Sequence, residues 1–69
     1  MERTPVSSSN IASVGYDSAS ATLEVEFHDG AIYQYFDVPS HEADGLVNAS
    51  SVGSYLASHI KGVYRYARI

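Results

Sequence analysis

The stretch TLEVEFHDGAIYQYFDV, residues 22–38, decides the fold of this chain. Apolar and polar side chains alternate strictly over residues 22–27, which is the pattern of a half-buried β-strand. A second run of apolar and aromatic residues covers 31–38, and the pair Asp29-Gly30 between the runs is typical of a β-hairpin. The stretch therefore predicts two antiparallel strands joined by a tight loop.

The length of that loop decides which way the tyrosines of the second strand face. A two-residue loop places Tyr33 and Tyr35 on the outer face, beside the glutamates of the first strand. A three-residue loop, with Gly30 in the left-handed conformation as a bulge, places both rings on the apolar face. We favour the three-residue loop because the apolar face needs cover, and aromatic and β-branched residues pair well across strands. It predicts the pairs Phe27 with Ala31, Val25 with Tyr33, and Leu23 with Tyr35.

The segments on either side of the hairpin are weaker in pattern. Residues 1–10 are polar and rich in serine, and we interpret them as a leader. Residues 11–16 alternate weakly and include two β-branched residues and an aromatic one, so they predict a strand. Residues 64–69 could add a fourth strand at the other end of the chain.

Two helices are predicted after the hairpin. The first runs from Pro39 to Ala49, because proline suits the first turn of a helix. The second follows Ser51, a good N-cap, and ends near Lys61, with Gly62 where a C-terminal cap belongs. Its apolar stripe has helical spacing and consists of Val52, Tyr55, Leu56, His59, Ile60 and Val63.

These elements predict one α+β domain over residues 1–69. Its sheet has three antiparallel strands in the order β-β-β-α-α, with residues 64–69 as a candidate fourth strand and both helices on one face. A chain of this length buries about 60% of the surface that its unfolded form exposes, so its core is thin. Self-association is the remaining source of stability, because the chain has no cysteine and no metal-binding pattern.

Composition limits the classes of function. The three histidines are far apart and no cysteine is present, so we expect no metal and no cofactor. No run approaches the roughly 18 apolar residues of a membrane span, and the N-terminal residues lack the apolar core of a signal peptide. We therefore expect a cytoplasmic protein without a membrane partner or a small-molecule substrate.

The charge is distributed unevenly along the chain. Residues 1–60 hold one basic and eight acidic residues, a charge of −7, whereas residues 61–69 hold three basic residues and no acidic one. The net charge of −4 argues against non-specific binding to nucleic acid, which usually needs a basic domain. The basic end is nevertheless interleaved with tyrosines.

That basic and aromatic segment is the leading candidate for a binding site. Single-strand binders combine cations with aromatic rings in this way, so the segment points to RNA or other single-stranded nucleic acid. Three cations predict a salt slope of only about −2, at roughly 0.7 per phosphate, and hence weak binding. A solvated tail beside the second helix is an equally good interpretation. The candidate residues are Lys61, Tyr64, Arg65, Tyr66 and Arg68.

Two other sets of residues are weaker candidates for the same ligand. Tyr33 and Tyr35 could stack bases, but rings on the apolar face are more simply explained as core. Ser8 and Ser9 could donate to phosphate or sugar oxygens, but short polar residues more often hydrogen-bond within turns. We rank both sets below the basic segment.

No catalytic residue is predicted, so we interpret the chain as a non-enzymatic binding module. His59 lies on an apolar stripe with no acidic residue three or four positions away, which favours a partly buried structural histidine. The glutamates of the first hairpin strand are predicted to lie on a solvated face. The alternative function is protein interaction or homodimerisation, through an uncovered sheet edge or a patch of Ile32 and Phe36.

A set of landmarks recurs in a fixed order along the chain: Ser8-Ser9-Asn10-Ile11, Gly15-Tyr16-Asp17, Leu23, Val25, Phe27, Gly30, Tyr33, Tyr35, Val38-Pro39, Leu46, Ala49, Ser51, Gly53, Ile60 and Tyr64. Their order and spacing resemble the KTSC domain family over nearly the whole chain. The family consists of small bacterial and phage domains that also occur at the C-terminus of some lysyl-tRNA synthetases. The resemblance implies a compact α+β domain for which RNA binding has been suggested, and no settled activity.

Overall fold

The hairpin at the centre of the fold has the three-residue loop. In the computed structural model, which describes residues 1–69, strand β3 (Thr22–Phe27) pairs with β4 (Ile32–Tyr35), and Val25 lies opposite Tyr33. The backbone N–H of Phe27 donates to the Ala31 carbonyl at 2.9 Å, and Gly30 has a φ of +94°. The predicted register is therefore confirmed, and both tyrosines lie on the apolar face of the sheet.

The sheet has five antiparallel strands, not three with a candidate fourth. Strand β1 (Thr4–Pro5), from the segment interpreted as a leader, pairs with β2 (Ile11–Asp17). Strand β5 (Tyr66–Arg68) pairs with β4, so the spatial order is β1-β2-β3-β4-β5. Strand β1 was not predicted, because it is two residues long and has no periodicity to detect.

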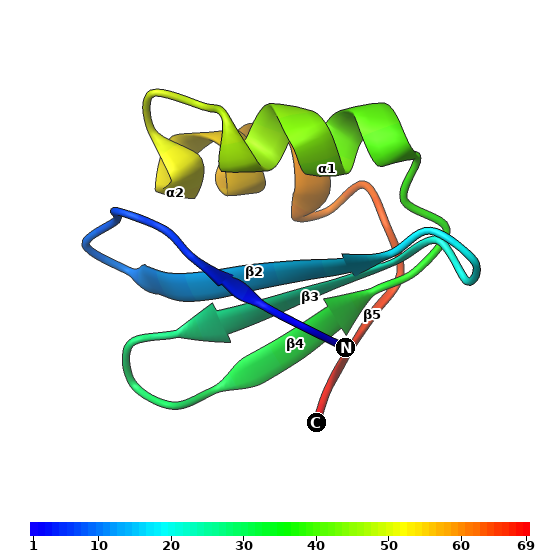
Figure 1. The fold of residues 1–69 in the computed structure, drawn as a ribbon, viewed down its shortest axis with the longest axis horizontal. Coiled ribbons are helices and arrows are strands. Elements are labelled where there is room, and N and C mark those ends of the chain that lie inside the picture. Colours follow the sequence, from blue (N-terminus) through cyan, green and yellow to red (C-terminus); the bar gives the residue numbers. More distant parts are fainter.

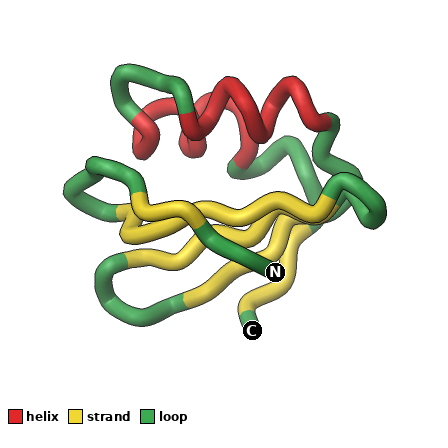
Figure 2. The backbone as a smooth tube through the Cα atoms, viewed as in Figure 1, coloured by secondary structure: helices red, strands yellow, loops and turns green.

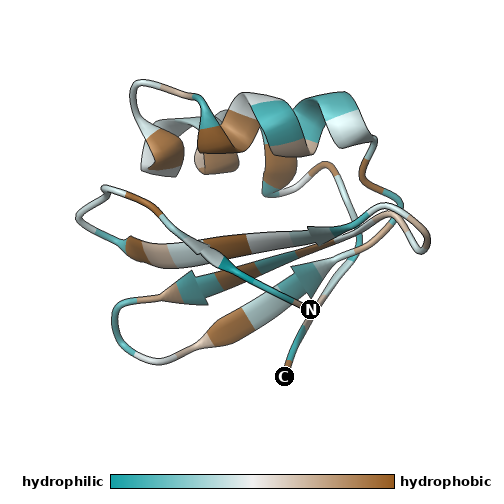
Figure 3. Cartoon of the chain, viewed as in Figure 1, coloured by the Kyte–Doolittle hydropathy of each residue, from teal (hydrophilic) through white to brown (hydrophobic).

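Two helical segments cover one face of this sheet, as predicted (Figures 1 and 2). Helix α1 spans Ser40–Val47, one residue inside the predicted start and two inside the predicted end. Figure 3 shows hydrophobic positions on both the helices and the strands, on either side of the space between the two layers. The buried core between the layers consists of Ile11, Val14, Leu23, Val25, Tyr35, Val38, Ala43, Leu46, Val52, Leu56 and Ile60.

The second helix changes its winding along its length. One α-helical turn, α2 (Val52–Tyr55), runs into a π-helical turn, η1 (Leu56–Ile60), in which the Lys61 N–H donates to the Leu56 carbonyl at 2.8 Å. Ser51 caps the start, as predicted, because its Oγ accepts from the N–H of Ser54 at 3.3 Å. Gly62 has a φ of +77°, as a left-handed residue after a helix should.

The π turn also corrects the predicted apolar stripe. A wider turn brings residues spaced by four onto one line, so Val52, Leu56 and Ile60 are the buried residues of this segment. His59 and Val63, which the regular helical spacing placed on the stripe, are exposed. No helix in the structure combines the length and the hydrophobicity needed to cross a membrane.

The outer face of the hairpin is not solvated at Glu24, contrary to the prediction. Glu24 is only 7% exposed, because the N-terminal residues cross this face. Its carboxylate accepts from Gln34 Nε2 at 2.9 Å and from Arg3 Nη1 at 2.5 Å. The hydrogen bond from Gln34, together with Arg3, lowers the pKa of Glu24 despite burial. Gly15 allows this crossing, since a Cβ there would lie 2.5 Å from the Glu2 carbonyl oxygen.

Candidate nucleic-acid interface

An open groove of about 580 Å³ lies on the helix side of the sheet, beside β4, β5 and the turn that follows η1. We call it the aromatic groove. It brings the hairpin together with residues some thirty positions later, so it exists only in the folded chain. The groove is lined by Phe27, Asp29, Ala31, Tyr33, Tyr35, Lys61, Gly62, Tyr66 and Arg68.

Four of the residues that line this groove are aromatic. Tyr33 is the central ring: its centroid lies 5.7 Å from that of Phe27, edge to face, and 5.9 Å from that of Tyr66. Tyr35 is 3% exposed, Tyr33 is half-buried, and Tyr66 is 61% exposed. Burial raises the pKa of Tyr35, and its neighbours Tyr33 and Tyr66 add to the effect. The exposed ring faces therefore belong to Tyr66 and, in part, to Tyr33.

Two cations and one carboxylate complete the groove. The Arg68 guanidinium lies 6.0 Å from the ring centroid of Tyr33, within the range of a cation–π contact. Lys61, at the end of η1, supplies the second positive charge. The Asp29 carboxylate is turned toward its own loop, where Oδ1 accepts from the Ala31 N–H at 3.0 Å. An anion that enters the groove therefore finds its partners at Lys61 and Arg68.

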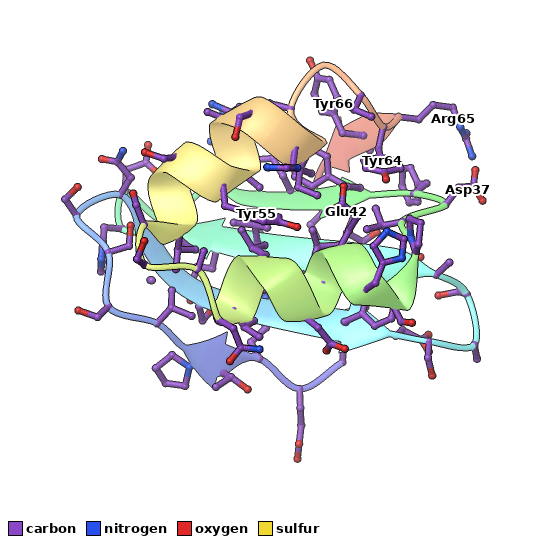
Figure 4. All side chains as sticks on the ribbon, turned by 90° about the horizontal axis from the view of Figure 1, so that it is seen from above. Asp37, Glu42, Tyr55, Tyr64, Arg65 and Tyr66 are labelled. Carbon is purple, nitrogen blue, oxygen red and sulfur yellow. The ribbon has the colours of Figure 1, made fainter.

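The structure divides the predicted basic and aromatic segment between two faces. Successive strand residues point to opposite sides, so Tyr66 and Arg68 enter the groove while Arg65 does not. Arg65 Nη2 instead donates to Asp37 Oδ2 at 3.0 Å, and its guanidinium lies 5.5 Å from the Phe36 ring (Figure 4). The groove also includes Tyr33 and Tyr35, which we ranked below the basic segment from the sequence.

Tyr64 is the other candidate that lies outside the groove. Its ring packs against the hydrophobic core, and burial raises its pKa, with a further contribution from the nearby Glu42 carboxylate. In Figure 4 Tyr64 lies among the side chains between η1 and α1, close to Glu42. We therefore assign Tyr64 a structural role.

Ser8 and Ser9, the weaker serine candidates, lie in the loop between β1 and β2, next to the β3–β4 hairpin loop. Ser8 Oγ accepts from the N–H groups of Asn10 and Ile11, each at 3.2 Å, which is the turn bonding expected of such residues. The Ser8 carbonyl in turn lies 2.9 Å from Nε2 of His28, which joins this loop to the hairpin loop. Ser9 is exposed and makes no side-chain hydrogen bond.

Sequence reasoning missed Phe27 and Asp29 as lining residues. Phe27 was assigned to the core because it shares a face with Leu23 and Val25, yet Phe27 is half-buried whereas those two are buried. Phe27 is the last residue of β3 and lines the groove from beside the hairpin loop. The only sequence signal was the place of Phe27 beside the loop.

A second cluster of titratable groups links α1 to the second helical segment. The Tyr55 hydroxyl donates to Glu42 Oε1 at 2.5 Å, and the His59 ring stacks on Tyr55 with centroids 4.1 Å apart. His59 Nδ1 lies 3.9 Å from the same carboxylate oxygen. The hydrogen bond to Glu42 raises the pKa of Tyr55. Gly45 leaves room for this ring, since a Cβ there would lie 2.8 Å from Tyr55 Cζ.

This cluster corrects the interpretation of His59, which has an acidic neighbour after all. The neighbour, Glu42, comes from a different helix, so spacing along one helix could not reveal it. None of the three residues lines the aromatic groove. No group of three or more histidine, aspartate and glutamate side chains is arranged to hold a metal ion.

Comparison with known proteins places this fold in a family. The model of the KTSC domain matches residues 7–66, and the chain therefore belongs to the KTSC domain family. A crystal structure of a KTSC domain protein from Yersinia pestis superposes with a TM-score of 0.93 at 39% identity, over 99% of this chain and 96% of that one.

Relatives of two kinds are similar in sequence. An uncharacterized protein from Stutzerimonas stutzeri strain A1501 is 41% identical over 100% of this chain and 99% of its own length. A lysine–tRNA ligase from Trichormus variabilis is 41% identical over 78% of this chain, but the match covers 10% of the ligase. The same small domain is thus found alone and as a minor part of these ligases.

Proposed function

We propose that this domain is a non-enzymatic module that binds single-stranded nucleic acid, RNA above all, in the aromatic groove. The observation that carries the proposal is the meeting of exposed tyrosine faces with two cations in one groove. Lys61, Tyr66 and Arg68 come from the segment that the sequence singled out, and Tyr33 joins them from the hairpin. Rings for bases and cations for phosphates are the two components of single-strand binding sites.

In this proposal each kind of group in the groove has its own role. Tyr66 and Tyr33 offer ring faces 5.9 Å apart between centroids, and a base stacked on an aromatic ring contributes roughly 1–3 kcal/mol. Such stacking is tolerant of sequence, because every base has a π-face. Arg68 and Lys61 then hold phosphates at the rim, while the carboxylate of Asp29 disfavours phosphate on its own side of the groove.

The relatives support an RNA ligand by association. The lysine–tRNA ligases that share this domain act, by name, on a transfer RNA, and the domain makes up a tenth of the ligase from Trichormus variabilis. A small domain that adds contacts to RNA would suit an enzyme that acts on a transfer RNA. It also fits a chain with the domain alone, because the groove is formed entirely within residues 27–68.

The salt dependence of binding tests this proposal. With Arg65 paired to Asp37 on the other face, two cations remain in the groove, and they predict a slope of log K against log salt of about −1.4, at roughly 0.7 per phosphate. Affinity for a fluorescein-labelled oligouridylate should then fall about sevenfold between about 50 and about 200 mM salt in an anisotropy titration. Binding that does not respond to salt, or no binding at about 50 mM salt, would contradict the proposal.

Pairing through a sheet edge is a second candidate function, supported by one observation. Strand β5 has no neighbour on its outer side. The Arg65 carbonyl accepts from the Phe36 N–H and the Ile69 N–H donates to the Ile32 carbonyl, each at 2.9 Å, so the backbone groups of Tyr66 and Arg68 point away from the sheet. The other candidate surface, Ile32 and Phe36, is half-buried and partly covered by Arg65. Edge pairing would protect the Tyr66 and Arg68 amides from exchange as protein concentration rises, without nucleic acid.

A further inference from the structure

The aromatic groove does not end at the hairpin loop. A second cleft of about 430 Å³ shares Phe27, Asp29 and Lys61 with it and continues to Ser9 and Asn10. We call this the linking cleft. A third cleft, of about 390 Å³, shares Ser9 and Asn10 with the linking cleft and extends to the start of the second helical segment. We call this third cleft the far cleft. In Figure 1 the loop before β2, the β3–β4 loop and the start of α2 lie at the same end of the sheet.

We propose that the three clefts form one track for single-stranded RNA, and that the far cleft selects RNA over DNA by contacting ribose 2′-hydroxyl groups. This inference rests on the proposed function, because the track begins in the aromatic groove. It goes further by naming the sugar as a recognised group and by assigning a role to the serine-rich loops.

The side chains of the far cleft suit a neutral, hydroxyl-bearing ligand. Ser7, Ser9, Ser50 and Ser54 are exposed there and none of their hydroxyl groups bonds within the protein. The side-chain amide of Asn10 is likewise exposed and without a partner. No charged residue lines this cleft. Hydroxyl and amide groups both donate and accept, as a 2′-hydroxyl does, and the 2′-hydroxyl is the group by which proteins distinguish RNA from DNA.

The linking cleft sets the orientation of the strand. Lys61 and Asp29 both line it, so its positive and negative groups face one passage. Phosphates are drawn to the Lys61 side and repelled by Asp29, which instead accepts from sugar hydroxyls or base amino groups. His28 fixes the serine loop to the hairpin loop through the 2.9 Å contact of its Nε2 with the Ser8 carbonyl. The passage is therefore held between two loops that are bonded together.

A strand that occupies all three clefts must be several nucleotides long. The longest dimension of the protein is 28 Å, and single-strand sites on small domains hold about four nucleotides or more. A dinucleotide would reach the aromatic groove alone. A pentanucleotide would reach the serines as well.

The test compares pentauridylate with its deoxyuridine counterpart, which differ only by the 2′-hydroxyl groups. We expect pentauridylate to bind at least about fivefold more tightly, the effect of losing one ordinary hydrogen bond. We also expect the Ser9 and Ser54 amides to shift in NMR spectra with pentauridylate and to stay still with diuridylate.

A matched pair of double variants separates the far cleft from a general effect. The Ser9→Ala/Ser54→Ala variant removes two unbonded, exposed hydroxyl groups, so it should fold normally and lose the preference for RNA. The Ser18→Ala/Ser40→Ala control removes two similar hydroxyl groups from the β2–β3 turn and the start of α1, at the opposite end of the fold (Figure 1), and should keep it. Equal affinity for the two pentamers, or a preference that survives Ser9→Ala/Ser54→Ala, would overturn the inference and leave the groove proposal intact. Absence of binding to either pentamer would overturn both.

Discussion

Replacing Leu46 with alanine is expected to unfold most of the protein. Leu46 is completely buried at the centre of the core, where α1 packs on the sheet. Truncating a buried leucine costs about 2–5 kcal/mol, because transfer energy is lost and a cavity remains. A domain of this size gains only roughly 3–5 kcal/mol from its single core. The substitution therefore removes most or all of the stability.

The neighbouring residue provides the control. Val47 belongs to the same helix but is 40% exposed, so Val47→Ala should change stability by less than about 0.5 kcal/mol. Urea unfolding followed by circular dichroism measures both variants. A Leu46→Ala midpoint equal to that of Val47→Ala would show that α1 does not close the core as described.

Reversing the charge of Arg68 is expected to abolish most nucleic-acid binding. Arg68→Glu removes a cation from the aromatic groove and adds an anion to a groove that Asp29 also lines. At about 4 Å in water, each of these changes is worth about 1 kcal/mol, so the two together predict about a thirtyfold loss of affinity. Arg68 is exposed on the edge strand, so the fold should survive the change.

Arg65→Glu is the matched control, because it makes the same change of charge three positions away on the opposite face. Arg65 pairs with Asp37 and contacts Phe36 rather than the groove. Its reversal should therefore lower affinity less than threefold in the same anisotropy assay. Equal losses for the two variants would indicate diffuse attraction to the basic end of the chain and not a site.

The central hairpin could be predicted from sequence because its signals are local. Strict alternation defined the buried face, and the need to cover that face chose the three-residue loop that the structure shows. The N-cap at Ser51 and the left-handed Gly62 are also properties of short segments, and both were confirmed. Strand β1 has no such signal, because two residues that include a proline become a strand only by pairing with β2.

The groove was harder to predict, because two side chains on the same face of a strand can differ in how far the rest of the protein buries them. Tyr33 and Tyr35 lie on one side of β4 and both line the groove, yet Tyr35 is 3% exposed and belongs to the core whereas Tyr33 is half-buried. The alternation along β4 gives both rings the same face and does not record this difference in burial. The π turn, after which His59 lies off the apolar stripe, is likewise not recorded in the periodicity of the sequence.

The division of the basic segment between two faces of the sheet could have been predicted from the sequence. Once residues 66–68 form a strand, the alternation of side chains places Arg65 on the other face of the sheet from Tyr66 and Arg68. The contacts between residues far apart in the sequence could not be predicted in this way. Glu42 meets His59 from another helix, and Arg3 covers Glu24 from the chain terminus.

The most direct test of the groove is an NMR titration of the labelled domain with pentauridylate at low salt. We expect shifts that saturate at the amides of Tyr33, Lys61, Tyr66 and Arg68, while the amides of Asp37 and Arg65 on the opposite face stay still. Spectra that do not change, or shifts concentrated at Phe36, Asp37 and Arg65, would contradict it.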